Sequence, residues 1–305
     1  MIARDFVFHR AETVEEAVQA WSEASRAGGS PQYFSGGTEI VTLAREGKQA
    51  PTDLVDIKRV PETQVLQEDG EDLVLGASLT LNTLADQADL PLTARCAAGV
   101  ADRTVRNSIT LGGNICGMLP YREAVLPFLL LDGQVDLAGP EGERRVSIHD
   151  VFRKKLNVRE GEFVLGFRLN RALLEQTNSA WFYRRRTSDS RIDYPVVTMA
   201  MSLLDGQVRL AVTGTWGYPY RALAAEDVAR DAMARGTLRS GSAEQLAAAM
   251  VDAVDLKVKK DMRAGAEYRR ELTVQALAEG LAALADAADA DTDTDPDGRD
   301  KETHR

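Results

Sequence analysis

Two pairs of adjacent glycines place the strongest constraint on how this 305-residue chain can fold. Gly36 and Gly37 interrupt the run YFSGGTEIV, and Gly112 and Gly113 interrupt the run RNSITLGGNIC. Paired glycines let the backbone adopt positive φ angles and approach another group closely. Successive backbone N–H groups at such a turn form a concave nest that binds anions. Two of these turns could hold the two halves of one diphosphate, with the rest of the chain as their scaffold.

The chain divides into two parts with different patterns, and we place the boundary near residue 175. In the first part, short apolar segments typical of strands alternate with helical patterns. Strands are expected at residues 6–10, 32–34, 54–57, 73–77, 134–137, 145–148 and 163–167. One helix begins after Thr13, whose pairing with Glu16 fits a capping box. Further helices are expected at about residues 40–44, 80–88, 92–105 and 122–131.

The second part has longer strands and longer helices. Two apolar strands, 196–203 and 208–212, flank Asp205 and Gly206, which is a hairpin signal. Helical patterns follow at about 222–234, 243–252 and 264–288. This order predicts an antiparallel sheet with helices on one face.

Composition narrows the function classes. The formal net charge is −10, and seven aspartates lie between residues 286 and 300, which is typical of a solvated acidic tail. An acidic balance argues against general binding to nucleic acid or anionic membranes. Two cysteines, Cys96 and Cys116, cannot form a disulfide framework and indicate a reducing compartment. No secretory signal or apolar run of membrane-spanning length is visible, so we expect a cytoplasmic protein.

Most familiar catalytic and nucleotide-binding motifs are missing from the sequence. It contains no G-x-G-x-x-G after the first strand and no G-x-x-x-x-G-K-[ST], which argues against Rossmann and P-loop proteins. It contains no H-E-x-x-H, C-x-x-C or G-x-S-x-G motif, which argues against a dedicated metal site and against a serine hydrolase. The glycine loops therefore remain as the candidate site, although a single Gly-Gly pair is more often only a turn.

The two loops and several later segments resemble one known family. SGGTEI at 35–40 and TLGGNI at 110–115 resemble the two flavin loops of the molybdenum hydroxylase flavoproteins. These are the medium subunits of bacterial enzymes of the xanthine dehydrogenase and carbon monoxide dehydrogenase type. AEYRR at 266–270 resembles a signature of the family's C-terminal domain, and YRRR at 183–186, followed by Asp193, also fits. The resemblance extends over about residues 3–287, in the family's order.

The resemblance implies an α+β protein. Residues 1–175 would form an FAD-binding domain of the p-cresol methylhydroxylase type, built from two small α/β subdomains. Residues 176–287 would form a C-terminal α+β domain with an antiparallel sheet and helices, and residues 288–305 an acidic disordered tail. FAD would lie between the domains, bound non-covalently because neither glycine loop contains a histidine or cysteine.

The same resemblance assigns residues to FAD. The first loop would bind one phosphate region and the second would bind the other side and approach the flavin ring. Glu123 stands where the family has an aspartate that contacts the flavin nucleotide, and Arg184 aligns with a lysine near the ring; the neighbouring segment 117–122 departs from the family's small polar run. The expected FAD-binding residues are Ser35, Gly36, Gly37, Thr38, Glu39, Ile40, Thr110, Leu111, Gly112, Gly113, Asn114, Glu123 and Arg184.

Other interpretations of some residues stay open at this point. The basic run 184–186 could be a solvated surface strip. Cys116 could be a small packing residue, a redox thiol or a flavin attachment point. Trp216 to Tyr220 could be a packed aromatic turn or a base-stacking platform, and Tyr268 a core anchor or an interface element.

The function implied by the resemblance is electron transfer. A large partner subunit would carry the molybdenum cofactor, and a small partner subunit would carry 2Fe-2S clusters that pass electrons to FAD on this chain. The acceptor would be NAD⁺ or another oxidant, and no catalytic side chain or metal ligand is expected here. Two alternatives are a self-sufficient flavin oxidoreductase and a scaffold that has lost FAD. The intact glycine pairs argue against the scaffold.

Overall fold

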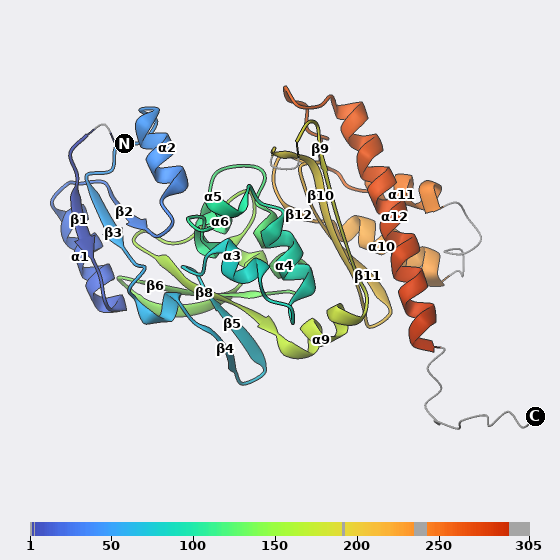
Figure 1. The fold of residues 1–305 in the computed structure, drawn as a ribbon, viewed down its shortest axis with the longest axis horizontal. Helices are drawn as coiled ribbons and strands as arrows, with labels where there is room; N and C mark the ends of the chain where they lie inside the picture. Colours follow the sequence, from blue (N-terminus) through green and yellow to red (C-terminus); the bar gives the residue numbers. More distant parts are fainter. Residues whose placement is uncertain (1, 3, 191–192, 235–242, 293–305) are drawn as a thin grey trace, which may run out of the picture.

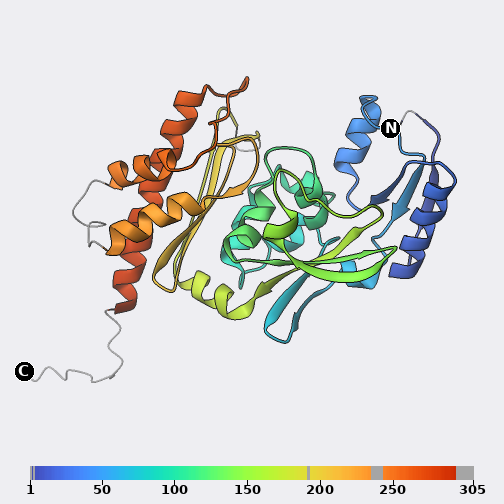
Figure 2. The same ribbon diagram turned by 180° about the vertical axis from the view of Figure 1, so that it is seen from behind.

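The computed structural model describes residues 2, 4–190, 193–234 and 243–292. It is a mixed helix-and-sheet protein in which three sheets follow one another along the chain. Figure 1 shows the three sheets side by side along the longest axis of the molecule, and Figure 2 shows the same order from behind. Residues 293–305, most of the acidic tail that the sequence predicts, lie outside the described residues.

The first body is a small parallel sheet with the strand order β1-β3-β2. Helix α1 begins at its expected cap, because the Thr13 hydroxyl accepts a hydrogen bond from the Glu16 amide. The Glu16 carboxylate in turn accepts one from the Glu12 amide. The elements are β1 (Val7–Arg10), α1 (Val14–Arg26), β2 (Pro31–Phe34), α2 (Thr38–Arg45) and β3 (Asp53–Asp56).

The second body is an antiparallel five-stranded sheet with the order β4-β5-β8-β6-β7. One face packs on short helices around fully buried Leu75, Phe128 and Phe167. The strands are β4 (Leu66–Asp69), β5 (Asp72–Gly76), β6 (Gln134–Gly139), β7 (Gly142–Ser147) and β8 (Phe163–Asn170). The helices are α3 (Leu81–Ala85), α4 (Pro91–Ala98), α5 (Arg103–Arg106), α6 (Leu111–Cys116), α7 (Leu126–Leu130) and α8 (Ile148–Val151), with 3-10 turns η1 (Pro61–Thr63) and η2 (Glu123–Val125).

Three expectations for this body were wrong in detail. The helix expected at 92–105 is two helices, α4 and α5, because the chain turns between them at Ala101, whose φ is +48°. The helix expected at 122–131 is the 3-10 turn η2 followed by α7, which has proline near its start. Strand β4 was missed because its polar sequence LQED lacks apolar alternation.

The third body is an antiparallel sheet with the order β12-β11-β10-β9, joined to the second by α9 (Arg171–Ser179). Its elements are β9 (Trp181–Thr187), β10 (Pro195–Leu204), β11 (Gln207–Thr213), β12 (Tyr220–Arg221), α10 (Leu223–Ala234), α11 (Ala243–Asp252) and α12 (Ala266–Thr292). The three helices cover the sheet face turned away from the rest of the molecule (Figures 1 and 2). The expected hairpin and the three expected helices are confirmed, although α12 runs from Ala266 to Thr292, beyond the expected end at about residue 288. No described helix is long and apolar enough to cross a membrane.

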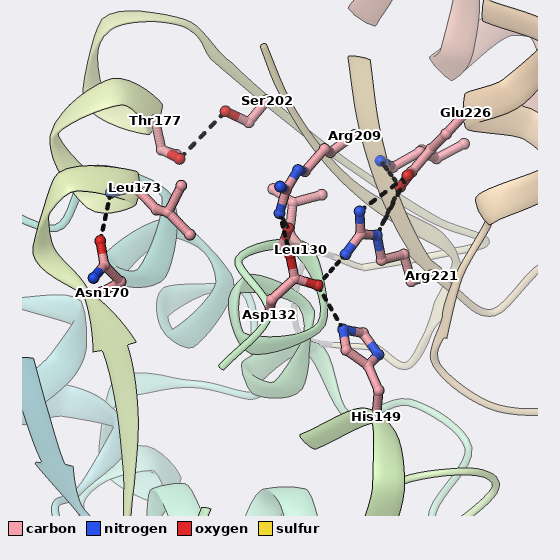
Figure 3. A network of polar contacts seen from close by, with 11 residues as sticks. Leu130, Asp132, His149, Asn170, Leu173, Thr177, Ser202, Arg209, Arg221 and Glu226 are labelled. Atoms are coloured by element: carbon pink, nitrogen blue, oxygen red, sulfur yellow. Dashed lines mark hydrogen bonds and ion pairs between the residues drawn. The ribbon is translucent and has the colours of Figure 1, made fainter. Parts of the chain in front are cut away.

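The inner face of the third sheet packs on α7 and α4, and Asp132 forms one polar anchor of this contact (Figure 3). Its carboxylate accepts hydrogen bonds from Arg209 (2.6 Å), from Arg221 and from His149 (3.0 Å). The hydrogen bond from His149 and the charges of Arg221 and Arg209 hold the pKa of Asp132 at about 2, against the effect of its burial. Arg221 also pairs with Glu226, so the network connects the second body to both β11 and α10.

We predict that Asp132→Ala lowers the free energy of unfolding by about 1 kcal/mol, because it removes partly exposed ion pairs that join the two bodies. The stabilisation by Asp132 should be present above the ordinary carboxyl pKa of about 3.9 and be lost as pH falls toward 2. Chemical denaturation at several pH values measures both effects. Asp150→Ala, at an exposed position nearby, is the control; equal losses in both variants would contradict the assignment.

Candidate cofactor cleft

A cleft of about 510 Å³ is lined by residues from both glycine loops and from the first and second sheets. The first loop contributes the whole run from Ser35 to Ile40. The second loop contributes Thr110, Gly112 and Gly113. The structure thus brings together nine of the thirteen residues that the sequence assigned to FAD.

The first loop connects the end of β2 to the start of α2, and its two glycines are needed for different reasons. Gly37 has φ +70°, which glycine adopts without strain. At Gly36 an added Cβ would lie 2.0 Å from the carbonyl oxygen of Ser108, so the two loops touch here. Within the described part of the chain, the amides of Thr38, Glu39 and Ile40 have no hydrogen-bond acceptor. They are the unpaired N–H groups of a helix start that lines the cleft, which is a favourable arrangement for an anion.

The second loop is not the nest of N–H groups that the sequence suggested. Gly112 and Gly113 lie in α6 without positive φ, and the Thr110 hydroxyl caps this helix. The amides of Leu111 and Gly112 already donate to Leu79 and Ala77, each over 2.8 Å. Gly112 is required instead by close packing, because an added Cβ would lie 2.8 Å from the Cβ of Ala77. The second loop therefore forms part of the cleft wall but provides few free N–H donors for a ligand.

Glu39 connects the two loops. Its carboxylate, in the first turn of α2, accepts a hydrogen bond of 2.8 Å from the amide of Met118, just after α6. The side chain thus spans from one wall of the cleft to the other.

Four predicted residues are not among those that line the cleft. Leu111 is fully buried in the core of the second body, and the Asn114 side chain accepts a hydrogen bond from the Ala124 amide. Arg184 lies over the Phe182 ring and pairs with Glu279 of α12. The fourth residue, Glu123, is buried between the second and third bodies.

Glu123 pairs with Arg185 of β9 at 3.3 Å, and only 2% of its side chain is exposed. Burial raises the pKa of this carboxyl to about 7, and the Arg185 guanidinium opposes the shift without cancelling it. A carboxyl that titrates near neutral pH inside an interface makes the stability of that interface pH-dependent.

Sequence reasoning missed several residues that line the cleft. Trp21, Tyr33 and Phe163 form an aromatic wall in which the Trp21 and Tyr33 rings stack at 6.4 Å and those of Tyr33 and Phe163 lie 4.5 Å apart. No local motif announces this wall, because its members come from three separate elements. Lys155 also lines the cleft, and the basic run RKK at 153–155 was the available signal for it.

Arg122 holds the far end of the second loop. It is 2% exposed, and it donates to the carbonyls of Ile115 and Gly117 and to that of Lys154. Its guanidinium also lies over the Phe152 ring, and burial lowers its pKa to about 10. The loop at 152–155 and the end of α6 are therefore fixed to each other by one buried cation.

Cys116 lines the cleft, but its thiol is not activated as a nucleophile. The residue as a whole is exposed, yet desolvation of its sulfur raises the pKa of the Cys116 thiol to about 12, so that it stays protonated at neutral pH. Neither cysteine is in a disulfide. A protonated thiol argues against a redox thiol and against a flavin attachment point, and the exposure of Cys116 argues against a core packing residue.

Comparisons with known proteins agree on one family. The sequence model of the protein family described as "FAD binding domain in molybdopterin dehydrogenase" matches residues 4–170 of this chain. The carbon monoxide dehydrogenase medium chain of Hydrogenophaga pseudoflava is 31% identical over 156 residues, which cover 50% of this chain and 53% of that protein. The xanthine dehydrogenase FAD-binding subunit of Escherichia coli O157:H7 is 26% identical over 90% of this chain and 96% of its own. A solved carbon monoxide dehydrogenase from H. pseudoflava, which lacks the Mo-pyranopterin moiety of the molybdenum cofactor, matches with TM-score 0.79 and 25% identity over 94% of this chain and 99% of that one.

We predict that Gly36→Ala abolishes cofactor retention and lowers the free energy of unfolding by about 3 kcal/mol, because the new methyl group forces the two loops apart. Flavin absorbance per polypeptide and chemical denaturation measure the two effects. Gly217→Ala is the matched control, since its Cβ would meet nothing within 4 Å. A Gly36→Ala protein with full flavin content would show that the loops need not touch.

We predict that Glu123→Gln removes a pH dependence of stability. A carboxyl whose pKa is raised by folding stabilises the fold below its ordinary pKa of about 4.3, and this contribution is lost as pH rises through about 7. The melting temperature of the wild type should therefore fall between about pH 5 and 8 more than that of Glu123→Gln. The exposed Glu160→Gln serves as control, and parallel pH profiles for all three proteins would refute the role of Glu123.

Proposed function

Because the chain belongs to the family of FAD-binding domains in molybdopterin dehydrogenases, we propose that it is the electron-transfer flavoprotein subunit of a heterotrimeric molybdenum hydroxylase. As a member of this family it is an FAD-binding oxidoreductase subunit related to those of carbon monoxide dehydrogenase and xanthine dehydrogenase. The observation that carries the proposal is the meeting of both glycine loops at one cleft, where α2 presents unpaired amides.

The residues of the cleft fit a flavin dinucleotide. The amides of Thr38, Glu39 and Ile40 would bind phosphate oxygens, and the nearby Lys155 would add positive charge. The aromatic wall of Trp21 and Tyr33 offers a planar apolar surface suited to a flat heterocycle. The remaining walls of the FAD site would be formed by Ser35, Gly36, Gly37, Thr110, Gly112 and Gly113. We take the FAD-binding domain to be of the p-cresol methylhydroxylase type and to extend to about residue 175.

In this proposal the four predicted residues that do not line the cleft support its shape and do not contact FAD. They are Leu111, Asn114, Glu123 and Arg184. Leu111 and Asn114 hold α6 in place from behind, through the core and through the Ala124 amide. Glu123 and Arg184 belong to the contacts of β9, where they would position the third body beside the cofactor.

FAD bound in this cleft supplies redox chemistry in both one-electron and two-electron steps. The chain itself would bind the cofactor, orient it and exclude water, while no side chain need act as nucleophile or general base. The proposed complex contains a large subunit with the molybdenum cofactor and a small subunit with 2Fe-2S clusters as electron donor. NAD⁺ or another oxidant would be the acceptor, and we keep a cytoplasmic location as part of the proposal.

The absorbance spectrum of the purified chain tests this function. We predict flavin bands near about 450 nm and release of intact FAD on heating, since no side chain of the glycine loops is suited to a covalent link. Co-expression with the two partner subunits should give one complex of three chains. A colourless protein that does not take up added FAD would contradict the cofactor assignment, and substrate turnover by the isolated chain would indicate a self-sufficient flavin enzyme.

A further inference from the structure

The segment 116–122, here called the strap, runs from the wall of the cofactor cleft, which its first three residues line, to contacts with the third body. The sequence had singled out most of this segment, 117–122, because it departs from the family's small polar run. The strap is fixed at both ends and in the middle. Glu39 accepts from the Met118 amide, Thr213 of β11 donates to the Pro120 carbonyl, and the Tyr121 hydroxyl donates to Asp261 over 2.7 Å.

The strap exposes large apolar side chains although its backbone is fixed. Met118 is 62% exposed and Leu119 44% exposed, while Met118 also lines the cleft. Met262, at 95% exposure, lies next to Arg263, whose guanidinium stands over the rings of Tyr121 and Tyr194. These apolar groups thus belong to one neighbourhood that reaches from the cleft to the third body.

Two basic segments flank the strap. Residues 153–159 and 257–263 contain eight lysines and arginines among fourteen residues and only one acidic residue, Asp261. They hold five of the eight lysines of a chain whose formal net charge is −10. Both contact the strap, because Lys154 accepts from Arg122 through its carbonyl and Lys259 donates to the Tyr121 hydroxyl over 2.6 Å. The two segments therefore carry more positive than negative charge on an acidic protein, with Arg159 paired to Glu141 and Lys259 paired to Asp261.

We propose that the strap and its two basic segments are the docking surface for an acidic face of the iron–sulfur subunit. The inference rests on the proposed function and adds where the donor binds and by what chemistry. Clustered cations attract a partner of opposite charge and orient it, while desolvated methionine and aromatic side chains supply contact area. Because Met118 belongs both to this surface and to the cleft wall, a partner docked here lies against the cofactor site.

Charge reversal on the surface tests the proposal in the assembled complex. Lys257 and Lys260 are exposed and do not line the cleft, so Lys257→Glu/Lys260→Glu should leave flavin content unchanged. We expect the double variant to bind the iron–sulfur subunit at least about tenfold more weakly at low salt, and the wild-type affinity to fall with ionic strength. Met262→Asp should weaken binding as well, with a smaller salt dependence.

The matched control is Arg10→Glu/Arg26→Glu, which makes the same change in net charge at exposed positions of the first body. Wild-type affinity in the Lys257→Glu/Lys260→Glu protein, or equal losses in both double variants, would overturn the docking surface. So would normal assembly combined with weaker NADH binding, which would assign the cations to a nucleotide. If the wild-type chain retains FAD but forms no complex with an iron–sulfur subunit, the proposed function fails together with its docking surface.

Discussion

Three consecutive side chains, those of Tyr121, Arg122 and Glu123, hold the architecture together by pointing to three different places. Tyr121 contacts Asp261 in the third body, Arg122 turns back to the carbonyls of Ile115 and Lys154, and Glu123 meets Arg185 on β9. All three follow the second glycine loop directly in the chain. The position of α6 is therefore coupled to the interface between the second and third bodies, and the shape of the cofactor cleft depends on that interface.

The buried cation Arg122 has no carboxylate as a hydrogen-bond partner among the described residues. It is hydrogen-bonded to carbonyl oxygens instead, although the Glu39 carboxylate acts on it through space. Its terminal nitrogens are hydrogen-bonded, but its Nε has no partner among the described residues, and the cation lies close to a cleft that also presents helix-start amides. Its positive potential adds to that of α2 and Lys155. An anion in the cleft would lie near these positive groups, beside the Glu39 carboxylate that also lines the cleft.

Much of this structure could be predicted from local sequence signals, and the remainder depends on contacts between distant residues. The capped helix α1, the hairpin at Asp205 and the helices of the third body follow from capping, turn and periodicity rules. Both glycine pairs line one cleft, but local signals did not predict the helical conformation of Gly112, whose packing on Ala77 is a tertiary contact. For the same reason the aromatic wall and the burial of Glu123 could not be predicted from the sequence. Both depend on which distant elements pack together, and local sequence signals do not give that packing.

The contacts of residues 120–132 with the third body determine where the chain can be divided into pieces for exchange. A cut near residue 175 separates the sequence patterns, yet the residues that hold the third sheet, from Pro120 to Asp132, would remain in the other piece. A chimera that exchanged only the C-terminal part between relatives would pair a foreign sheet with an unmatched α7 and Asp132. Transplanting residues 114–132 together with the C-terminal part would keep both sides of the interface from one parent. By these contacts, this stretch and the third body would have to be exchanged together, although about 40 residues of other structure separate them in the chain.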